Sequence, residues 1–177
     1  VVIGALSSAL PEAAVGAANG ANTMAVFAGN NPETGEPYVY LETLGGGFGG
    51  RNDRDGKDGV QVHITNTSNL PIEAIEMEYP LLVERYGFIP DSGGAGQYRG
   101  GLGLQRVVRP IGHTCTFNGV GERFRNKPWG IFGGQPGGTG SFSTVSDEGI
   151  NTRLSNKPST LRVGPDHVIR VITAGAG

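Results

Sequence analysis

DSGGAGQYRGGLG, residues 91–103, decides how this chain folds. The stretch holds six glycines together with one carboxylate, one serine hydroxyl and one guanidinium. Apolar residues at 81–88 and 102–108 flank it, and apolar flanks of this kind require burial. Residues 91–103 are therefore expected inside a folded domain and not in a linker. Glycines in such a place reach positive φ angles, let two backbones approach closely, or align N–H groups toward an anion.

Asp91, Ser92 and Arg99 in this stretch have two interpretations. In the first, Asp91 and Ser92 bond nearby backbone N–H groups and hold the turn, while Arg99 pairs with Asp91 or another carboxylate. In the second, the three side chains line a small-molecule site. Asp, Ser and Gly are the ordinary turn-forming residues, which favours the first interpretation.

The composition predicts one compact domain over residues 1–177. Glycine is abundant, with 32 residues, but it follows no period of three, which excludes a collagen-like chain. Charged residues are only 17% of the chain, and the net charge is −2. This balance lacks the charge excess of a disordered chain or of a protein that binds nucleic acid without specificity.

The single cysteine, Cys115, has no partner for an internal disulfide and is expected to be a packed thiol. No apolar stretch approaches the ~20 residues of a membrane span. The opening residues, VVIGALSSAL, lack the basic start of a signal peptide, so a cytoplasmic location is expected.

Turn residues and apolar alternation predict a β-rich α+β fold with few short helices and one or two antiparallel sheets, a sandwich being one arrangement. Strands at 24–28 and 38–42 are expected to form a hairpin, and an Asn cap followed by an early proline predicts a short helix over 71–77. In the first half of the chain, the other predicted elements are the last turns of a helix in 1–9, a loop at 13–22, a strand at 60–64 with His63 on its polar face, and an extended segment at 81–90. Strands are predicted at 102–110 and 113–120, joined by a Pro-Ile-Gly turn, and at 141–145. A polar loop at 146–157 and a hairpin of 160–163 with 167–172 complete the prediction.

Three kinds of binding motif are incomplete in this chain. Gly45, Gly47 and Gly50 match the spacing of a dinucleotide-binding loop, but polar turn residues follow where that motif must open a helix. The aspartates of 53–58 are out of register with a calcium-binding EF-hand loop. The three histidines lie at least 50 residues apart, without metal-ligand spacing. No metal site is predicted.

Glu73 and Glu76 lie one turn apart on the predicted helix, where two carboxylates can act as acid and base or bind a metal. Solvated glutamates in a first turn, which the helix dipole favours, are the commoner case. Trp129, the only tryptophan, stands between Pro128 and Gly130. A large rigid ring in this position most often seals the edge of a core, and the alternative is a binding-site wall or a subunit contact.

Three stretches, EYPLLVERY (78–86), DSGGAGQYRGGLG (91–103) and KPWGIFGGQPGG (127–138), together carry a family resemblance. They make residues 66–138 similar to the hydantoinase B/5-oxoprolinase family, which also includes the larger subunits of acetone and acetophenone carboxylases. The likeness extends to VVIGALSSALP at the start, to the glycine-rich segment 45–59, and to ITAGAG at 172–177. Family members are considerably longer, so the chain resembles the carboxy-terminal part of such a subunit, cut at both ends.

The resemblance implies ATP-dependent opening of a cyclic amide such as a hydantoin or 5-oxoproline, in which phosphorylation of the carbonyl oxygen creates a leaving group. It also implies an ATP-binding hydantoinase A-type partner subunit and hetero- and homo-oligomers, with neither nucleic acid nor membrane as a partner. In the carboxylase relatives, His and Asp residues of the amino-terminal part hold a divalent metal. ATP and metal are thus implied for the full enzyme, while this chain, which lacks that part, is expected to bind no cofactor.

Two alternatives stay open: an acetone-type ketone carboxylase subunit, and a non-catalytic scaffold that docks the ATP-binding partner. The isolated chain is expected to be inactive. The glycine turns are predicted to present N–H groups to an oxyanion, with Asp91, Arg99 and Arg123 as orienting charges. The catalytic candidates are Glu73, Glu76, Asp91, Arg99 and Arg123, and the substrate-binding candidates are Gly46, Gly47, Asn66, Ser92, Gly93, Gly94 and Trp129.

Overall fold

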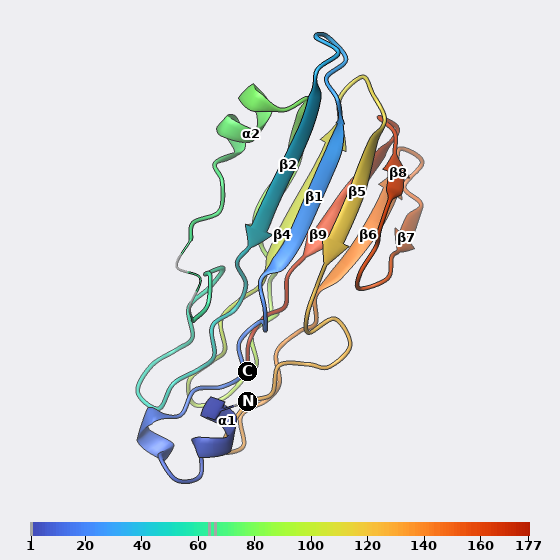
Figure 1. The fold of residues 1–177 in the computed structure, drawn as a ribbon. Helices are drawn as coiled ribbons and strands as arrows, with labels where there is room; N and C mark the ends of the chain where they lie inside the picture. The colour runs from blue at the N-terminus through green and yellow to red at the C-terminus, as the bar shows by residue number, and fades with distance from the viewer. Residues whose placement is uncertain (1, 64, 66) are drawn as a thin grey trace.

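Two antiparallel β-sheets stack face to face in the computed structural model, which describes residues 2–63, 65 and 67–177 (Figure 1). The first sheet has the order β2-β1-β5-β8, and the second has the order β3-β4-β9-β6-β7. The prediction of a β-rich α+β fold is confirmed, and the sheets form a sandwich. The strands are β1 (Thr23–Asn30), β2 (Pro37–Leu44), β3 (Leu81–Phe88), β4 (Leu104–Pro110), β5 (Cys115–Val120), β6 (Ser141–Ser146), β7 (Asn151–Arg153), β8 (Leu161–Val163) and β9 (His167–Ile172).

The helices are short and lie outside the sandwich (Figure 1). They are α1 (Val2–Leu6), the 3-10 helix η1 (Pro11–Ala13) and α2 (Ile72–Glu78). The predicted helix over 71–77 is confirmed as α2. Asn69 does not cap it, because its side-chain oxygen accepts a hydrogen bond from the N–H of Gly45 instead, at 3.1 Å. No helix in the described ranges is long and apolar enough to cross a membrane.

Inward-facing residues of both sheets build the sandwich core. In β1, buried and half-buried positions alternate over most of the strand, as one buried face requires. The Phe117 ring of β5 lies 5.0 Å from the Phe27 ring in its own sheet and 5.6 Å from the Phe142 ring in the other, between centroids. Cys115 belongs to the same core, and burial raises the pKa of its thiol. The prediction of a packed thiol is confirmed.

One ion pair lies inside this core, between the two sheets. Arg106 of β4 is only 2% exposed and donates to the carboxylate of Glu42 on β2. Its guanidinium also lies over the ring of Tyr86, 4.2 Å from the centroid. The other carboxylate oxygen of Glu42 accepts a hydrogen bond from the N–H of Leu70 at 2.7 Å. The pair therefore joins the two layers and the segment before α2.

The predicted hairpin of 160–163 and 167–172 is wrong. Strand β8 pairs with β5, whereas β9 pairs with β4 and β6, so the turn between them passes from one sheet to the other. The Pro-Ile-Gly turn that ends at Gly112 does the same between β4 and β5. The turn residues indicate where the chain reverses, but the sheet that a strand joins depends on partners far away in sequence.

The predicted strand at 60–64 is also wrong. Val60 makes only an isolated bridge with Gly46, residues 61–63 form no strand, and Ile64 lies outside the described residues. His63 has a φ of 57°, a left-handed conformation that interrupts an extended backbone. The polar loop predicted at 146–157 contains the additional strand β7. In the helix predicted within 1–9, Val1 is outside the described residues, and α1 ends at Leu6.

Glycine-rich segments pack backbone against backbone beyond one end of the sandwich. The central segment, 173–177, continues from β9 and is buried throughout. Its main chain is hydrogen-bonded to segments 16–19, 45–50, 92–103 and 128–138. We call these five segments the glycine bundle. The prediction that the glycines of 91–103 lie inside a folded domain is confirmed.

Close approach of main chains explains the glycines of this bundle. The N–H of Gly94 donates to the C=O of Ala176 at 2.7 Å, and the N–H of Ala176 donates to the C=O of Gly101 at 3.0 Å. A Cβ atom at Gly100 would lie 1.9 Å from the carbonyl oxygen of Ala176. Any side chain at Gly100 would therefore force the two main chains apart.

Candidate functional site

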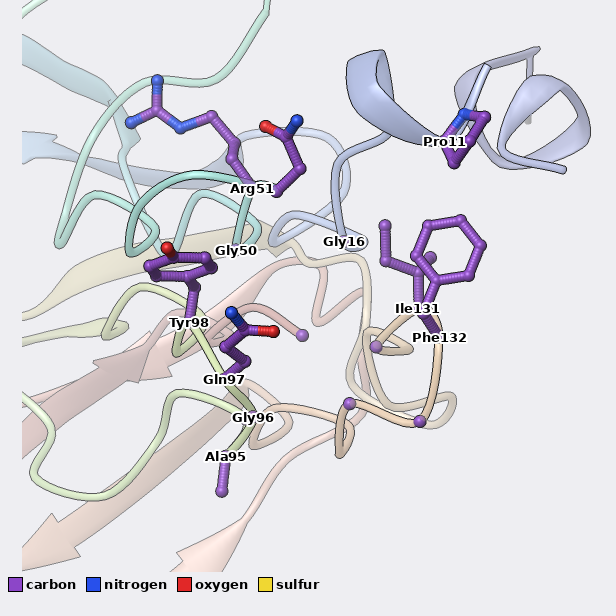
Figure 2. Close-up of a pocket in the computed structure, with 16 residues that line it drawn as sticks. Pro11, Gly16, Gly50, Arg51, Ala95, Gly96, Gln97, Tyr98, Ile131 and Phe132 are labelled. Carbon is purple, nitrogen blue, oxygen red and sulfur yellow. The ribbon is translucent and has the colours of Figure 1, made fainter. Parts of the chain in front are cut away.

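A pocket of about 260 Å³ opens on the surface of the glycine bundle (Figure 2). Three loops, 50–52, 94–98 and 130–134, form most of its wall, and Pro11, Gly16 and Gly177 complete it. Eight of its lining residues are glycines, so main-chain groups form much of its surface.

A type I′ turn forms one side of the pocket. The N–H of Gly134 donates to the C=O of Ile131 at 2.9 Å, and the two residues between them, Phe132 and Gly133, have φ angles of 49° and 89°. Phe132 is bulky for a left-handed conformation and is 67% exposed. Within the part of the chain that the structure describes, the N–H groups of Phe132 and Gly133 donate to no acceptor. They are available to a ligand.

Gln97 and Tyr98 supply the polar side chains of the facing wall. Figure 2 shows the amide of Gln97 turned toward the open centre of the pocket. The loop is held by the N–H of Gln135, which donates to the C=O of Ala95 at 2.8 Å. None of the described lining residues is Asp, Glu, His or Cys. The pocket can therefore bind a polar group or a developing negative charge through N–H donors, and it supplies no carboxylate or imidazole for proton transfer.

Ser92 and Asp91 lie at the turn that leads into this wall. The hydroxyl of Ser92 donates to the C=O of Ile89 at 2.7 Å and accepts from the N–H of Gly103 at 2.9 Å. Asp91 is exposed and has a φ of 57°, a left-handed conformation in which Asp is enriched. The bonds of Ser92 fit the interpretation in which this side chain holds the turn, and neither residue lines the pocket.

Arg99 forms a bidentate ion pair with Asp58 and not with Asp91. Its Nη1 and Nη2 donate to the two carboxylate oxygens of Asp58 at 2.7 Å and 2.9 Å. The carboxylate of Asp58 also accepts a hydrogen bond from the N–H of Leu102 at 2.8 Å. The hydrogen bonds from Arg99 lower the pKa of Asp58 below its ordinary value of 3.8. Arg99 therefore ties the loop at 55–58 to the glycine bundle.

Asp58→Asn is expected to lower the free energy of unfolding at pH 7 by about 1 kcal/mol, because Arg99 loses a charged acceptor in a partly exposed pair. The folded-state pKa of Asp58 lies below the unfolded value, so the wild-type advantage is present above about pH 4 and is lost as the pH falls through the folded-state pKa. Urea unfolding at pH 7 and at pH 3 measures this difference. Asp53→Asn, which removes an exposed carboxylate paired with Arg54, should leave the midpoint unchanged. A loss for Asp58→Asn that is equal at both pH values would contradict the ion-pair assignment.

The glutamates of α2 lie at the far end of β3 from the pocket. This strand has eight residues and spans roughly 25 Å. Glu76 accepts a hydrogen bond from the N–H of Val83 at 2.9 Å. Arg123 lies in the loop after β5, with a φ of 58°, and does not line the pocket. The structure thus does not bring Glu73 and Glu76 together with residues 91–99, and the catalytic roles of these candidates stay predictions.

Among the substrate-binding candidates that the structure describes, Gly94 alone lines the pocket. Three others lie within the bundle, where a Cβ atom would come within 2.8 Å of a main-chain oxygen: Gly46, Gly47 and Gly93. Asn66 lies outside the described residues.

Trp129 lies where α1 meets the glycine bundle. Its ring atoms would be 2.8 Å from a Cβ atom placed at Gly4 of α1, and its C=O accepts a hydrogen bond from the N–H of Ala17 at 2.9 Å. This packing fits the interpretation in which the ring seals the edge of a core. A role in substrate binding stays a prediction.

The family of the chain follows from comparison with known proteins. The family model of hydantoinase B/oxoprolinase matches residues 1–177. The chain belongs to this family.

Relatives within the hydantoinase B/oxoprolinase family are much longer than this chain. An uncharacterized protein of Methanocaldococcus jannaschii is 38% identical over 177 residues, which cover all of this chain and 30% of the relative. The B-type subunit of a putative D-/L-hydantoinase of Pseudomonas sp. is 35% identical over 157 residues, or 89% of this chain and 26% of the relative. 5-Oxoprolinase 1 of Arabidopsis thaliana is 34% identical over 142 residues, which cover 80% of this chain and 11% of the relative. The chain therefore spans less than a third of each.

Two solved structures share the fold of this hydantoinase B-family chain. The ATP-dependent caprolactamase from Pseudomonas jessenii has a TM-score of 0.77 at 21% identity, over 98% of this chain and 31% of its own. The nucleotide-free structure of an acetone carboxylase has a TM-score of 0.77 at 19% identity, over 95% of this chain and 26% of its own. The sandwich and the glycine bundle thus occur within larger ATP-dependent enzymes.

None of the described side chains that line this hydantoinase B-family pocket was a candidate from the sequence: Pro11, Arg51, Asn52, Ala95, Gln97, Tyr98, Ile131 and Phe132. A signal existed for the last two, because a residue followed by two glycines, as in GIFGG, is typical of a turn with positive φ angles. Gln97 and Tyr98 are neutral and carry no motif of their own. Over the ranges that the structure describes, no three His, Cys, Asp or Glu side chains gather as a metal site.

Proposed function

We propose that this chain is part of a hydantoinase B-type subunit that takes part in ATP-dependent hydrolysis of a cyclic amide, such as a hydantoin or 5-oxoproline. The match of the whole chain to the family model carries this proposal. It is supported by 34% and 35% identity to a 5-oxoprolinase and a hydantoinase subunit, and by the fold shared with a caprolactamase. Hydantoin, 5-oxoproline and caprolactam are all cyclic amides.

ATP meets the chemical difficulty of this hydrolysis, because an amide carbonyl is a weak electrophile and its nitrogen is a poor leaving group. Phosphoryl transfer from ATP to the carbonyl oxygen gives ADP and a more electrophilic carbon. Water adds to that carbon, the ring nitrogen leaves with a proton, and the resulting acyl phosphate is hydrolysed to a carboxylate and phosphate. Negative charge develops beside the reacting carbon during these steps.

The pocket of the glycine bundle suits the stabilisation of this charge. The free N–H groups of Phe132 and Gly133 are donors held in place by the type I′ turn, and Gln97 adds a side-chain amide to the facing wall. The pocket has no described carboxylate or imidazole, so we assign proton transfer and ATP binding, with any divalent metal, to regions beyond these residues and to a hydantoinase A-type partner subunit. Arg99 is engaged by Asp58, and we assign it a structural role.

Two alternatives remain as outcomes of a test. Ketone carboxylation is favoured by the fold shared with acetone carboxylase, but the 19% identity shows the fold alone. A scaffold that only docks the ATP-binding partner is favoured by the lack of a carboxylate or imidazole among the described pocket residues.

Steady-state kinetics of the full-length subunit, assembled with its ATP-binding partner, distinguishes these functions. Gln97→Ala is expected to lower kcat/KM for the cyclic amide by roughly 10- to 100-fold, because one amide donor is lost. Gln135→Ala, at an exposed glutamine outside the pocket, is the matched control and should keep the wild-type value. Equal kinetics for both variants in a correctly assembled complex would indicate a scaffold. Bicarbonate-dependent consumption of acetone without amide hydrolysis would indicate a carboxylase.

A further inference from the structure

A second hollow, of about 740 Å³, lies beside the glycine bundle. Its residues come from the loop between β2 and α2 and from β3. Arg51 is the only described residue that it shares with the pocket of Figure 2. The residues used below are Phe48, Arg51, Lys57, Gln61, His63 and Tyr86.

Two cations of this hollow have no carboxylate partner. Among the described residues, Arg51 and Lys57 form no ion pair. The neighbouring carboxylates of Asp53, Asp55 and Asp58 face other arginines. No Asp or Glu belongs to the described wall of the hollow. The described wall therefore carries two positive charges that form no ion pair with a carboxylate.

The Phe48 ring contacts two side chains of the hollow, Arg51 and His63. The guanidinium carbon of Arg51 lies 5.6 Å from the ring centroid, and the His63 ring centroid lies 5.6 Å from it as well. Figure 2 shows the Arg51 side chain extending away from Gln97 and Ile131. Its Nε is buried and has no hydrogen-bond partner in the described chain. His63 holds its left-handed φ of 57°, and strained conformations of this kind cluster at ligand sites.

Gln61 adds an unused acceptor to the same wall. Its Nε2 donates to the C=O of Thr43 at 2.6 Å and to the side-chain oxygen of Asn69 at 3.2 Å, which fixes the orientation of the amide. Its Oε1 is buried without a donor from any described residue. Gln61 is therefore a fixed polar residue of the wall, with an acceptor that no described donor satisfies.

We propose that this hollow binds a small oxyanion, as a phosphate or carboxylate group, between Arg51, Lys57 and His63. Unpaired guanidinium and ammonium groups are the common protein ligands of such anions, and the bond they form is stronger than one between neutral groups. The hydroxyl of Tyr86 and the acceptor of Gln61 lie in the same wall and give the site polar groups that a bare charged surface lacks. The site shares only Arg51 with the proposed catalytic pocket among the described residues, and it does not depend on the proposed function.

Inorganic phosphate is the probe, titrated into this 177-residue chain at constant ionic strength and followed by the NMR shifts of backbone amides. We expect saturable shifts at Lys57, Gln61 and His63, with a dissociation constant on the order of 1 mM. Lys57→Gln and Arg51→Gln are each expected to weaken binding by about 10-fold, because one charged donor is lost. Lys57 is exposed, so its variant should keep the wild-type unfolding curve and report on binding alone.

Arg54→Gln is the matched control, because it removes the same charge from the same loop but from an arginine paired with Asp53. Its affinity for phosphate should stay within about two-fold of wild type. Equal losses for Arg54→Gln and Lys57→Gln would show a non-specific charge effect and would overturn the site. Absence of saturable shifts with both phosphate and acetate would overturn it as well. Tighter binding of one anion than the other would support the site and identify the group it takes.

Discussion

Gly100→Ala is expected to lower the free energy of unfolding by about 3 kcal/mol or more. The added Cβ would lie 1.9 Å from the carbonyl oxygen of Ala176 and 2.4 Å from its carbon. These are main-chain atoms of the buried central segment and have no rotamer by which to move away. Relief of the clash requires separation of two segments of the glycine bundle, with loss of hydrogen bonds between them. Urea unfolding of the purified variant measures the effect.

Gly87→Ala provides the matched control for this substitution. Gly87 lies in β3, and a Cβ atom there would meet nothing within 4 Å. Alanine also restricts the unfolded chain more than glycine does, so Gly87→Ala is expected to be neutral or to stabilise by less than about 1 kcal/mol. If the two alanine variants unfolded at the same urea concentration, close main-chain packing around Gly100 would not hold the bundle together.

Arg106→Met is expected to cost about 3–5 kcal/mol, because it leaves the carboxylate of Glu42 buried without its counter-charge. The pair lies between the sheets, and Arg106 is 2% exposed. Methionine keeps much of the side-chain length, so the loss reports mainly on the charge. The double variant Glu42→Gln with Arg106→Met should recover part of the stability, since the buried charge is then absent.

The control for the buried pair is Arg109→Met on the same strand. Arg109 pairs with Glu84 and Asp147 at the surface, where an ion pair contributes little. We expect Arg109→Met to change the free energy of unfolding by less than about 1 kcal/mol. Equal losses for the two arginine variants, or no recovery in the double variant, would contradict the assignment of Glu42 and Arg106 as a core pair.

Local signals predicted the elements that depend on neighbouring residues. The β1–β2 hairpin follows from β-propensity and from the turn residues between its two strands. Helix α2 follows from an early proline. The sequence shows all of these signals. Pairing between distant strands has no such signal, and the prediction that 160–163 pairs with 167–172 in a hairpin was wrong for this reason. The segment at 60–64 alternates as a strand does, yet the left-handed conformation of His63 interrupts it.

The candidate site was only partly predictable. The sequence showed that the glycines of 91–103 belong inside a domain, and their abundance suggested main-chain contacts. It could not show that segment 173–177 would lie at the centre of the bundle, because each glycine there has its partner in a remote segment. The pocket side chains Gln97 and Tyr98 are neutral, and the charged candidate Arg99 proved to be engaged in an ion pair with Asp58. The buried pair of Glu42 and Arg106 was not predicted either, because its two members lie 64 residues apart in the sequence.

Native-state hydrogen exchange of the glycine bundle tests most directly whether these segments form a packed unit. The N–H groups of Gly94, Ala176 and Gly177 donate to main-chain carbonyls inside the bundle. We expect each of them to exchange as slowly as the N–H groups in the centre of β1, through opening that approaches global unfolding. Exchange of these three amides at the rate of an exposed loop, while β1 stays protected, would show that the glycine-rich segments are mobile and do not form the pocket.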